Sequence, residues 1–462
     1  MGIIKAYVLP HPPLAVPEVG RGKEAEIKRT LEAFDEVAAE IAGLAPETII
    51  YITPHNVLYA DYFHISPGTS ANGDLSRFGA PATTYMELDY DVPLVTEIER
   101  LAERSGIAAG TLGEKSKTLD HGFTVPAWFV NRRYGDYKAV RISQSGMEPA
   151  MHYRFGQIIA EAAEAIGRKA VLIASADLSH KLSDEGPYGF APEGAEFDGI
   201  IVDILSGGDF LSLFTIPDAL RDDAAECGYN SLTIMAGCFD RRNVNSKLLS
   251  YEGPFGVGYA VASIEPGEPA NDRDILEQFK GISLSRASKS RDAEDDYRAL
   301  ARRSLEHMIE NCVELPLPGD LPDELLEYKA GVFVSLHKNG SLRGCIGTIS
   351  PTTDCVAREI IQNAVSAGLN DSRFEPVSAS ELPYLTYKVD VLSAPEPISS
   401  PEELDVKRYG VIVTSGYKRG LLLPNLDGVN TVAEQISIAK SKAGISGSDP
   451  IKLERFEVVR HE

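Results

Sequence analysis

The sequence of 462 residues has few cysteines, a single tryptophan and no long hydrophobic run. The five cysteines include no Cys-x-x-Cys pair, so we expect neither a disulfide framework nor a structural thiolate zinc site. No apolar stretch approaches the roughly 20 residues of a membrane-spanning helix. The first residues lack the basic and then apolar layout of a signal peptide, so we expect a cytoplasmic protein.

Positive charge is also scarce. Lys and Arg number 45 against 68 Asp and Glu, which gives a formal net charge of −23. Nucleic acids and anionic membrane surfaces are bound through clustered basic side chains, so we expect neither as a partner. Of all residues, 43% are hydrophobic and 24% are charged, which is typical of a globular protein with enough apolar residues for a large core. The length predicts two domains.

The order of predicted elements divides the chain into two domains and a linker. Residues 1–265 alternate strands with helices, which predicts an α/β domain with a central sheet flanked by helices. Residues 266–293 are dominated by Glu, Pro, Asp, Ser and Lys and are predicted to be the linker. Residues 294–462 begin with an amphipathic helix and continue with a hairpin pattern, which predicts an α+β domain.

Three predicted buried strands of the first domain are followed by chemically active side chains. The strand over residues 3–9 precedes His11, the strand over 48–53 precedes His55, and the strand that starts at Ala170 precedes Asp177 and His180. In open α/β sheets, ligands gather at the carboxyl ends of the strands, so these side chains are well placed for chemistry. His64 and His152 lie in ordinary strand and helix contexts and are predicted to be structural.

His11, His55 and a later acid fit the 2-His-1-carboxylate arrangement, which leaves open positions on Fe(II) for substrate and dioxygen. Glu226 is the candidate acid; its structural alternative is a carboxylate that meets the positive end of a helix. The adjacent Cys227 is an alternative ligand, or else a small buried hydrophobic residue. Divalent metals other than iron remain possible.

Two further histidines, His121 and His180, are predicted to handle protons, because a neutral imidazole can take a phenolic proton and return it later. Asp177 either orients His180 or caps the next turn.

Five motifs occur in order through the first domain: Pro10-His11-Pro12, Thr53-Pro54-His55, Asp120-His121-Gly122, Ser175-Ala-Asp-Leu-Ser-His180 and Glu226-Cys-Gly-Tyr-Asn-Ser231. This set resembles the motif series of class III extradiol ring-cleavage dioxygenases and the related Memo proteins over about residues 1 to 265. The resemblance implies Fe(II) bound by His11, His55 and Glu226, with His180 as base and His121 as acid or substrate contact. Memo proteins have a cysteine near the acidic position, which keeps Cys227 as an alternative.

The second domain contains Leu342-Arg-Gly-Cys-Ile-Gly347, Asn370-Asp-Ser-Arg-Phe-Glu-Pro376 and Gly420-Leu-Leu-Leu-Pro424. These motifs resemble the AMMECR family over about residues 294 to 460. Arg343 beside Cys345 could lower the pKa of the thiol and create a nucleophile, and Arg373 is a further candidate. The alternative is that the two glycines and the small Cys345 pack a strand tightly against a helix.

The tandem order of the two domains resembles the AmmeMemoRadiSam system proteins, which implies a radical SAM protein as a partner. From the motifs of the first domain, we expect a non-haem Fe(II) dioxygenase of the extradiol type, with a catechol-like aromatic compound and dioxygen as substrates. The alternative is a metal-binding or redox accessory protein of a radical SAM system without ring cleavage, and a third possibility is a scaffold with both sites vestigial. We also expect a homo-oligomer.

Overall fold

The computed structural model describes residues 2–80, 82–426, 429–446 and 449–462. The chain divides into two compact units, residues 1–280 and 281–462, which we describe separately as the first and second unit. In the part of the chain that the structure describes, no helix combines the length and the apolar character needed to cross a membrane.

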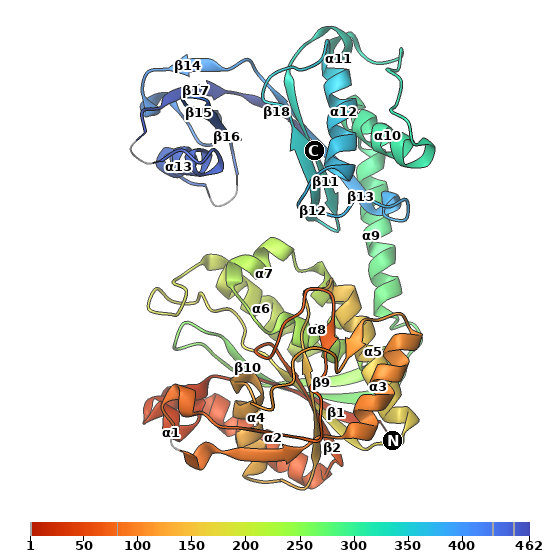
Figure 1. Cartoon of the computed structure of the whole chain (residues 1–462), viewed down its shortest axis with the longest axis vertical. Helices are drawn as coiled ribbons and strands as arrows, with labels where there is room; N and C mark the ends of the chain where they lie inside the picture. The colour runs from red at the N-terminus through yellow and green to blue at the C-terminus, as the bar shows by residue number, and fades with distance from the viewer. Residues whose placement is uncertain (1, 81, 427–428, 447–448) are drawn as a thin grey trace. The chain divides into compact units, whose positions relative to one another are not determined.

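A six-stranded mixed sheet forms the centre of the first unit (Figure 1). Its strands are β1 (Ile3–Leu9), β2 (Thr48–Thr53), β7 (Lys138–Ser143), β8 (Ala170–Ser175), β9 (Arg242–Glu252) and β10 (Tyr259–Pro269). The order across the sheet is β7-β2-β8-β1-β10-β9. The first four strands are parallel to one another, β10 pairs antiparallel with β1, and β9 pairs antiparallel with β10. The predicted α/β architecture is confirmed.

Helices cover both faces of this sheet. The central strands β2 and β8 are buried along their whole length and consist mainly of small, β-branched and other apolar residues, as expected for parallel strands covered on both sides. Side chains on one face pack against α2 (Lys28–Leu44) and α4 (His121–Asn131). The other face packs against α3 (Val92–Arg104), α5 (Pro149–Ala165), α6 (Pro192–Gly207) and α8 (Tyr229–Gly237).

Shorter elements complete the first unit. They are α1 (Pro17–Gly20), α7 (Asp218–Ala224) and two small sheets, one of β3 (Phe63–His64) with β6 (Ala109–Gly110) and one of β4 (Ser70–Gly73) with β5 (Met86–Asp89). The edge strand β9 has no counterpart among the predicted elements, because its polar and apolar residues alternate weakly and most of it is partly exposed.

The segment predicted to be the linker contains α9 (Ile275–Asp292), and the boundary between the two units falls inside this helix. Ile275, Leu276 and Phe279 pack against the core of the first unit. The few apolar residues of this segment thus hold the start of α9 on the first unit.

The second unit has two four-stranded sheets, which confirms the predicted α+β class. The first sheet has the order β12-β11-β13-β18, and α10 and α12 pack on it; the second has the order β14-β17-β15-β16 and carries α13. The bounds are α10 (Asp296–Asn311), α11 (Asp323–Glu327), α12 (Val356–Leu369), α13 (Val432–Lys442), β11 (Gly331–Lys338), β12 (Ser341–Gly347), β13 (Leu385–Leu392), β14 (Glu396–Ile398), β15 (Gly410–Ser415), β16 (Lys418–Leu422), β17 (Lys452–Phe456) and β18 (Val458–His461).

Glycine permits close packing at the first motif of the second unit. A β-carbon at Gly344 of β12 would lie only 2.1 Å from the carbonyl oxygen of Ala367 in α12. The strand therefore lies directly against the helix backbone, as the packing alternative for this motif predicted. The hairpin between β11 and β12 is also confirmed, and its turn places Asn339 and Gly340 at positive φ.

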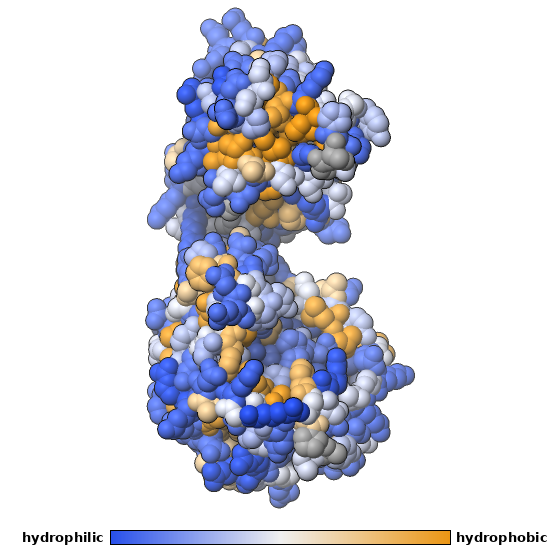
Figure 2. All heavy atoms as spheres, turned by 90° about the vertical axis from the view of Figure 1, so that its left-hand side faces the viewer, coloured by the Kyte–Doolittle hydropathy of each residue, from blue (hydrophilic) through white to orange (hydrophobic). Residues whose placement is uncertain are grey.

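An apolar patch lies on the second unit, where Figure 2 shows a group of hydrophobic side chains. A groove of about 870 Å³ runs beside α13 and is lined in part by Leu404, Val432, Ile436 and Ile445.

Candidate metal centre

The carboxyl ends of three neighbouring parallel strands meet at one edge of the first unit's sheet. β2, β8 and β1 are adjacent in the sheet, and His11 and His55 each lie two residues beyond the end of their strand. Asp177 lies two residues beyond β8. The sheet order, which the sequence did not give, is what brings these segments together.

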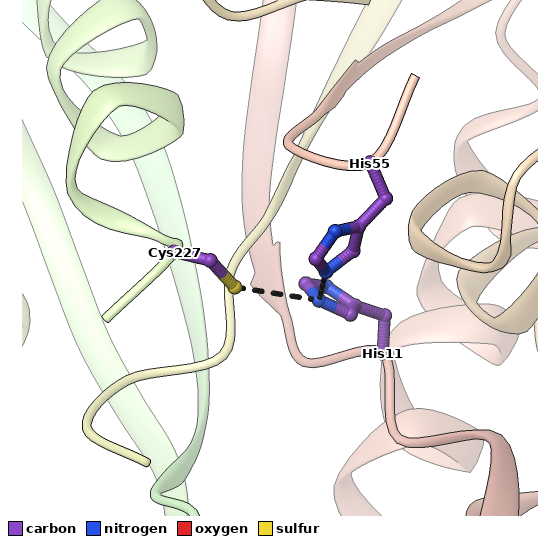
Figure 3. Close-up of side chains that lie close together, drawn as sticks. All are labelled: His11, His55 and Cys227. Atoms are coloured by element: carbon purple, nitrogen blue, oxygen red, sulfur yellow. Dashed lines mark hydrogen bonds between the residues drawn. The ribbon is translucent and has the colours of Figure 1, made fainter. Parts of the chain in front are cut away.

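Three potential ligand atoms lie together at this edge. The Nε2 atoms of His11 and His55 are 2.9 Å apart, and Sγ of Cys227 is 3.5 Å from Nε2 of His11. All three ligand atoms lie within 4.8 Å of one another, and Figure 3 shows the three side chains pointing toward a common point. His11 is buried, Cys227 half-buried and His55 exposed, so the cluster is open on one side.

The electrostatics keep this cluster uncharged when no cation is bound. Burial lowers the pKa of His11 well below its usual value, and the nearby His55, His121 and His180 lower it further. Burial raises the pKa of the Cys227 thiol, and the carboxylates of Asp177 and Glu226 add to this effect. A bound cation would reverse the balance for the thiol, because metal ligands bind in their deprotonated forms.

Glu226 lies outside this cluster. Its carboxylate accepts a hydrogen bond of 2.6 Å from the N–H of Tyr229, the first residue of α8. This contact matches the structural role that the sequence predicted as the alternative for Glu226, namely a carboxylate at the positive end of a helix. Burial raises its pKa to about 7. Of the two adjacent candidates, the structure brings Cys227 to the histidines and turns Glu226 to the helix.

A glycine lets the Cys227 segment approach the sheet. A β-carbon at Gly228 would lie 2.6 Å from the β-carbon of Ala176 and 2.8 Å from the carbonyl oxygen of Asp177. Any side chain at position 228 would therefore push the segment away from the end of β8. The close approach places the Cys227 thiol 3.7 Å from the Asp177 carbonyl, to which it donates.

Asp177 contacts His11. Its Oδ1 accepts a 2.7 Å hydrogen bond from the backbone N–H of His11, and its Oδ2 is 3.7 Å from Nε2 of the same residue. Neither predicted role, orienting His180 or capping the next turn, matches this contact. Burial raises the pKa of Asp177 to about 7.

The two predicted proton handlers flank the cluster. The ring of His121 stacks on that of His55 with centroids 4.2 Å apart, and burial lowers the pKa of His121 to about 4. Burial also lowers the pKa of His180. Within the described residues, Nδ1 of His180 is buried without a hydrogen-bond partner. His64 and His152 bond backbone groups, in keeping with a structural role.

Asp120 supports this edge, although it was given no role from the sequence. Its side chain caps α4 through the N–H of Phe123 and accepts a 2.5 Å hydrogen bond from Oγ1 of Thr53. Its charge also raises the pKa of His55 against the lowering by burial. An aspartate directly before an apolar helical run is an N-cap signal, so the sequence contained a clue to this residue.

In the second unit, the guanidinium of Arg343 is directed to Glu381, with Nε 3.0 Å from Oε2. Arg373 donates to the carbonyl oxygen of Cys345 and pairs with Asp371, which also accepts from the N–H of Cys345. The hydrogen bonds from Arg373 hold the pKa of Asp371 well below its usual range. The Cys345 thiol accepts a hydrogen bond from Ser335. Arg373 is therefore the arginine that binds the Cys345 segment.

The ion pair of Arg343 should make the stability of the second unit depend on pH. Burial by itself raises the pKa of Glu381, but hydrogen bonds from Arg343 and Ser378 and the charge of Lys338 outweigh it and lower the pKa to about 2. The stabilisation is thus present above the ordinary pKa near 4.5 and is lost as the pH falls through about 2. Glu381→Gln should destabilise the unit at pH 7 by about 1.5–3 kcal/mol.

Calorimetry of the full chain can measure this effect. Fluorescence of the single Trp128, which lies in α4, identifies the transition of the first unit. The difference between wild type and variant should shrink toward pH 2. A difference that stays constant with pH would contradict the role of the charged pair.

Two family models match the chain. Residues 5–262 match the catalytic LigB subunit of aromatic ring-opening dioxygenase, and residues 298–461 match AMMECR1. A protein of Clostridium acetobutylicum is 43% identical over 464 residues, which cover 99% of this chain and 98% of the relative. A protein of Thermotoga maritima is 47% identical over 171 residues, which cover 37% of this chain and 98% of the relative.

Two solved structures are also similar. The crystal structure of an uncharacterized protein from Pyrococcus horikoshii has a TM-score of 0.33 and 33% identity, and covers 36% of this chain and 88% of that chain. The crystal structure of an uncharacterized protein from Escherichia coli K12 has a TM-score of 0.33 and 14% identity, and covers 56% of this chain and 99% of that chain.

The first matched region spans more than half of the chain and includes every residue of the cluster at the strand ends. The Clostridium acetobutylicum relative aligns across both matched regions, so the two regions also occur together in that protein. This chain therefore belongs to the LigB family of aromatic ring-opening dioxygenase subunits and carries an AMMECR1 domain after its LigB domain.

Proposed function

We propose that the first unit is a non-haem Fe(II) enzyme that opens a catechol-like ring with dioxygen. The observation that carries this proposal is the cluster in which Cys227, from the segment before α8, meets His11 and His55 at the carboxyl ends of the parallel strands β1 and β2. Membership of a ring-opening dioxygenase family supports the reaction class. Iron and the aromatic substrate are parts of the proposal.

The donor set fits a divalent transition metal ion. Two imidazole nitrogens and one sulfur lie within 4.8 Å of one another, and His11, His55 and Cys227 would hold the ion. Imidazole ligands suit iron, copper and zinc. A thiolate ligand is softer than the carboxylate of the 2-His-1-carboxylate arrangement and favours copper and zinc as well. When bound, such an ion supplies Lewis acidity and, for iron or copper, redox chemistry.

Two histidines beside the cluster can move protons of the substrate. Burial lowers the pKa of His180, which favours the neutral imidazole, and a neutral imidazole can accept a proton from a phenolic hydroxyl. His121 has its pKa lowered to about 4 and is neutral at pH 7, so its ring can donate one hydrogen bond to a substrate oxygen. The proposal assigns the base to His180 and the substrate contact to His121.

Exposed aromatic rings beside both histidines favour a flat aromatic substrate. Phe78 meets His121 edge-on with centroids 5.2 Å apart, and Tyr188 meets His180 edge-on at 5.8 Å. Phe78 is 39% exposed and Tyr188 is 65% exposed, so both rings have free surface. Aromatic pairs in offset or edge-on geometry attract each other beyond their buried area.

The test is turnover by anaerobically purified protein loaded with Fe(II). A panel of catechols with dioxygen should give yellow ring-opened products, with both oxygen atoms of one dioxygen molecule retained in each product. His180→Ala should keep its metal and lose turnover by about 10²- to 10⁴-fold, because a general base contributes that much. His307→Ala, in the second unit, is the matched control. Bound iron without product across the panel would count against ring cleavage.

The sulfur of Cys227 also favours a second candidate function. With Cys227 in place of a carboxylate, the site has a softer donor set than the 2-His-1-carboxylate arrangement, and softer ligands also suit metal sites without ring cleavage. The first unit would then be a metal-binding or redox accessory module that works with a radical SAM protein. A panel that yields no product, together with capture of such a partner by the metal-loaded full chain, would favour this candidate.

A further inference from the structure

The buried hydroxyl of Ser175 lies between a candidate ligand and a helix. Ser175 is the last residue of β8 and is fully buried. Its Oγ donates a 2.5 Å hydrogen bond to the carbonyl oxygen of Gly122 in α4. The same Oγ is 2.8 Å from Nδ1 of His11. Ser175 therefore connects the ends of β1 and β8 with the first turn of α4.

A proline frees the carbonyl that receives this bond. In an α-helix, the carbonyl of each residue accepts a hydrogen bond from the N–H of the residue four positions later. For the carbonyl of Gly122 this residue is Pro126, which has no N–H to donate. A buried carbonyl needs another donor, and the Ser175 hydroxyl supplies it. A β-carbon at Gly122 would lie 2.5 Å from Oγ1 of Thr53, so only glycine fits where this carbonyl is presented.

Counting protons fixes the direction of the second bond. A hydroxyl has one proton, and the proton of Ser175 goes to Gly122 because a carbonyl only accepts. Oγ must then accept from Nδ1–H of His11. An imidazole with its single proton on Nδ1 has its lone pair on Nε2, and this is the atom that faces His55 and Cys227.

We infer that Ser175 is a positioning residue that holds His11 in the tautomer whose Nε2 lone pair points into the His11–His55–Cys227 cluster, with Pro126 and Gly122 setting the direction of its hydroxyl. The consequence for metal binding rests on the proposed function. The hydrogen bond from the His11 N–H to Asp177 fixes the backbone of the same residue, so both ring and backbone are held in place. Partners of this kind orient metal ligands and set their basicity.

The tautomer can be measured in the metal-free full chain by ¹⁵N chemical shifts of labelled histidine rings, with the His11 signals assigned by their loss in His11→Gln. Wild-type His11 should be protonated on Nδ1. In Ser175→Ala the Nε2-protonated form should appear, because Nδ1 loses its acceptor. An Nε2-protonated ring in the wild type, or an unchanged tautomer in the variant, would overturn the inference. The wild-type measurement requires no variant to fold.

Cobalt(II) binding by the same proteins provides the second readout. Ser175→Ala should bind Co(II) about 10- to 100-fold more weakly than wild type, the usual effect of removing a residue that bonds a metal ligand. Ser304→Ala is the matched control, since Ser304 is a fully buried serine of the second unit that donates to the carbonyl of Ile361. Equal affinities of wild type and Ser175→Ala would contradict the positioning role. If wild type shows the expected tautomer but binds no metal, the proposed function fails and the assignment of Ser175 stands.

Discussion

Replacing Cys227 with alanine is expected to weaken binding of Fe(II) or Co(II) by more than about 100-fold. Residues that only orient a ligand are worth about 10- to 100-fold, and loss of a ligand itself should cost more. The sulfur of Cys227 lies 3.5 Å from Nε2 of His11 and completes the group of three potential ligands. Equilibrium dialysis with metal analysis measures the affinity, and the sulfur-to-cobalt charge-transfer absorption reports the thiolate directly.

Two variants make this experiment decisive. Glu226→Gln should bind metal nearly as well as wild type, because a glutamine oxygen can still accept the hydrogen bond from the Tyr229 N–H. Cys312→Ser removes an exposed free cysteine in the second unit and should change nothing. Loss of metal in Glu226→Gln with retention in Cys227→Ala would reverse the assignment of the third ligand.

Replacing Gly156 with alanine should destabilise the first unit by about 3 kcal/mol or more, at the upper end of the usual cost of overpacking. Gly156 in α5 and Gly237 in α8 bring the backbones of the two helices into contact. A β-carbon at Gly156 would lie 2.0 Å from the carbonyl oxygen of Ile234, so the helices must separate. Because Cys227 lies two residues before α8, the same shift should weaken metal binding.

Unfolding followed by fluorescence of Trp128 measures this effect in the first unit. The matched control is Gly199→Ala in α6, where no atom lies within 4 Å of the added β-carbon and φ is not positive. That variant should be as stable as wild type or more stable by up to about 1 kcal/mol, because alanine is the better helix former. Equal stabilities of the two variants would show that the α5–α8 contact does not require glycine.

Much of the first unit could be predicted from local patterns. The strands that end before His11 and His55 are short runs of mostly apolar and β-branched residues, and the structure contains them with the predicted bounds. The edge strand β9 could not be predicted in this way. Its residues alternate weakly, and it is a strand because β10 offers a free edge for pairing.

The choice between Glu226 and Cys227 lay beyond any local pattern. Adjacent residues in an irregular segment point in different directions, and both side chains are suitable metal ligands. The contact of Gly228 with Ala176 fixes the path of this segment, and that contact joins residues about 50 positions apart in the sequence. Asp177 is a similar case, because its partner His11 comes from a distant strand.

By itself, the sequence determined which side chains follow the buried strands, and therefore that His11 and His55 would stand at strand ends. Only the tertiary structure decided which residues meet there. The order β2-β8-β1 places the two histidines side by side, the approach at Gly228 selects Cys227, and the proline in α4 gives Ser175 its hydrogen-bond direction. The physical reason is that hydrophobic periodicity specifies local elements, whereas sheet order and backbone contacts depend on packing between segments far apart in the chain.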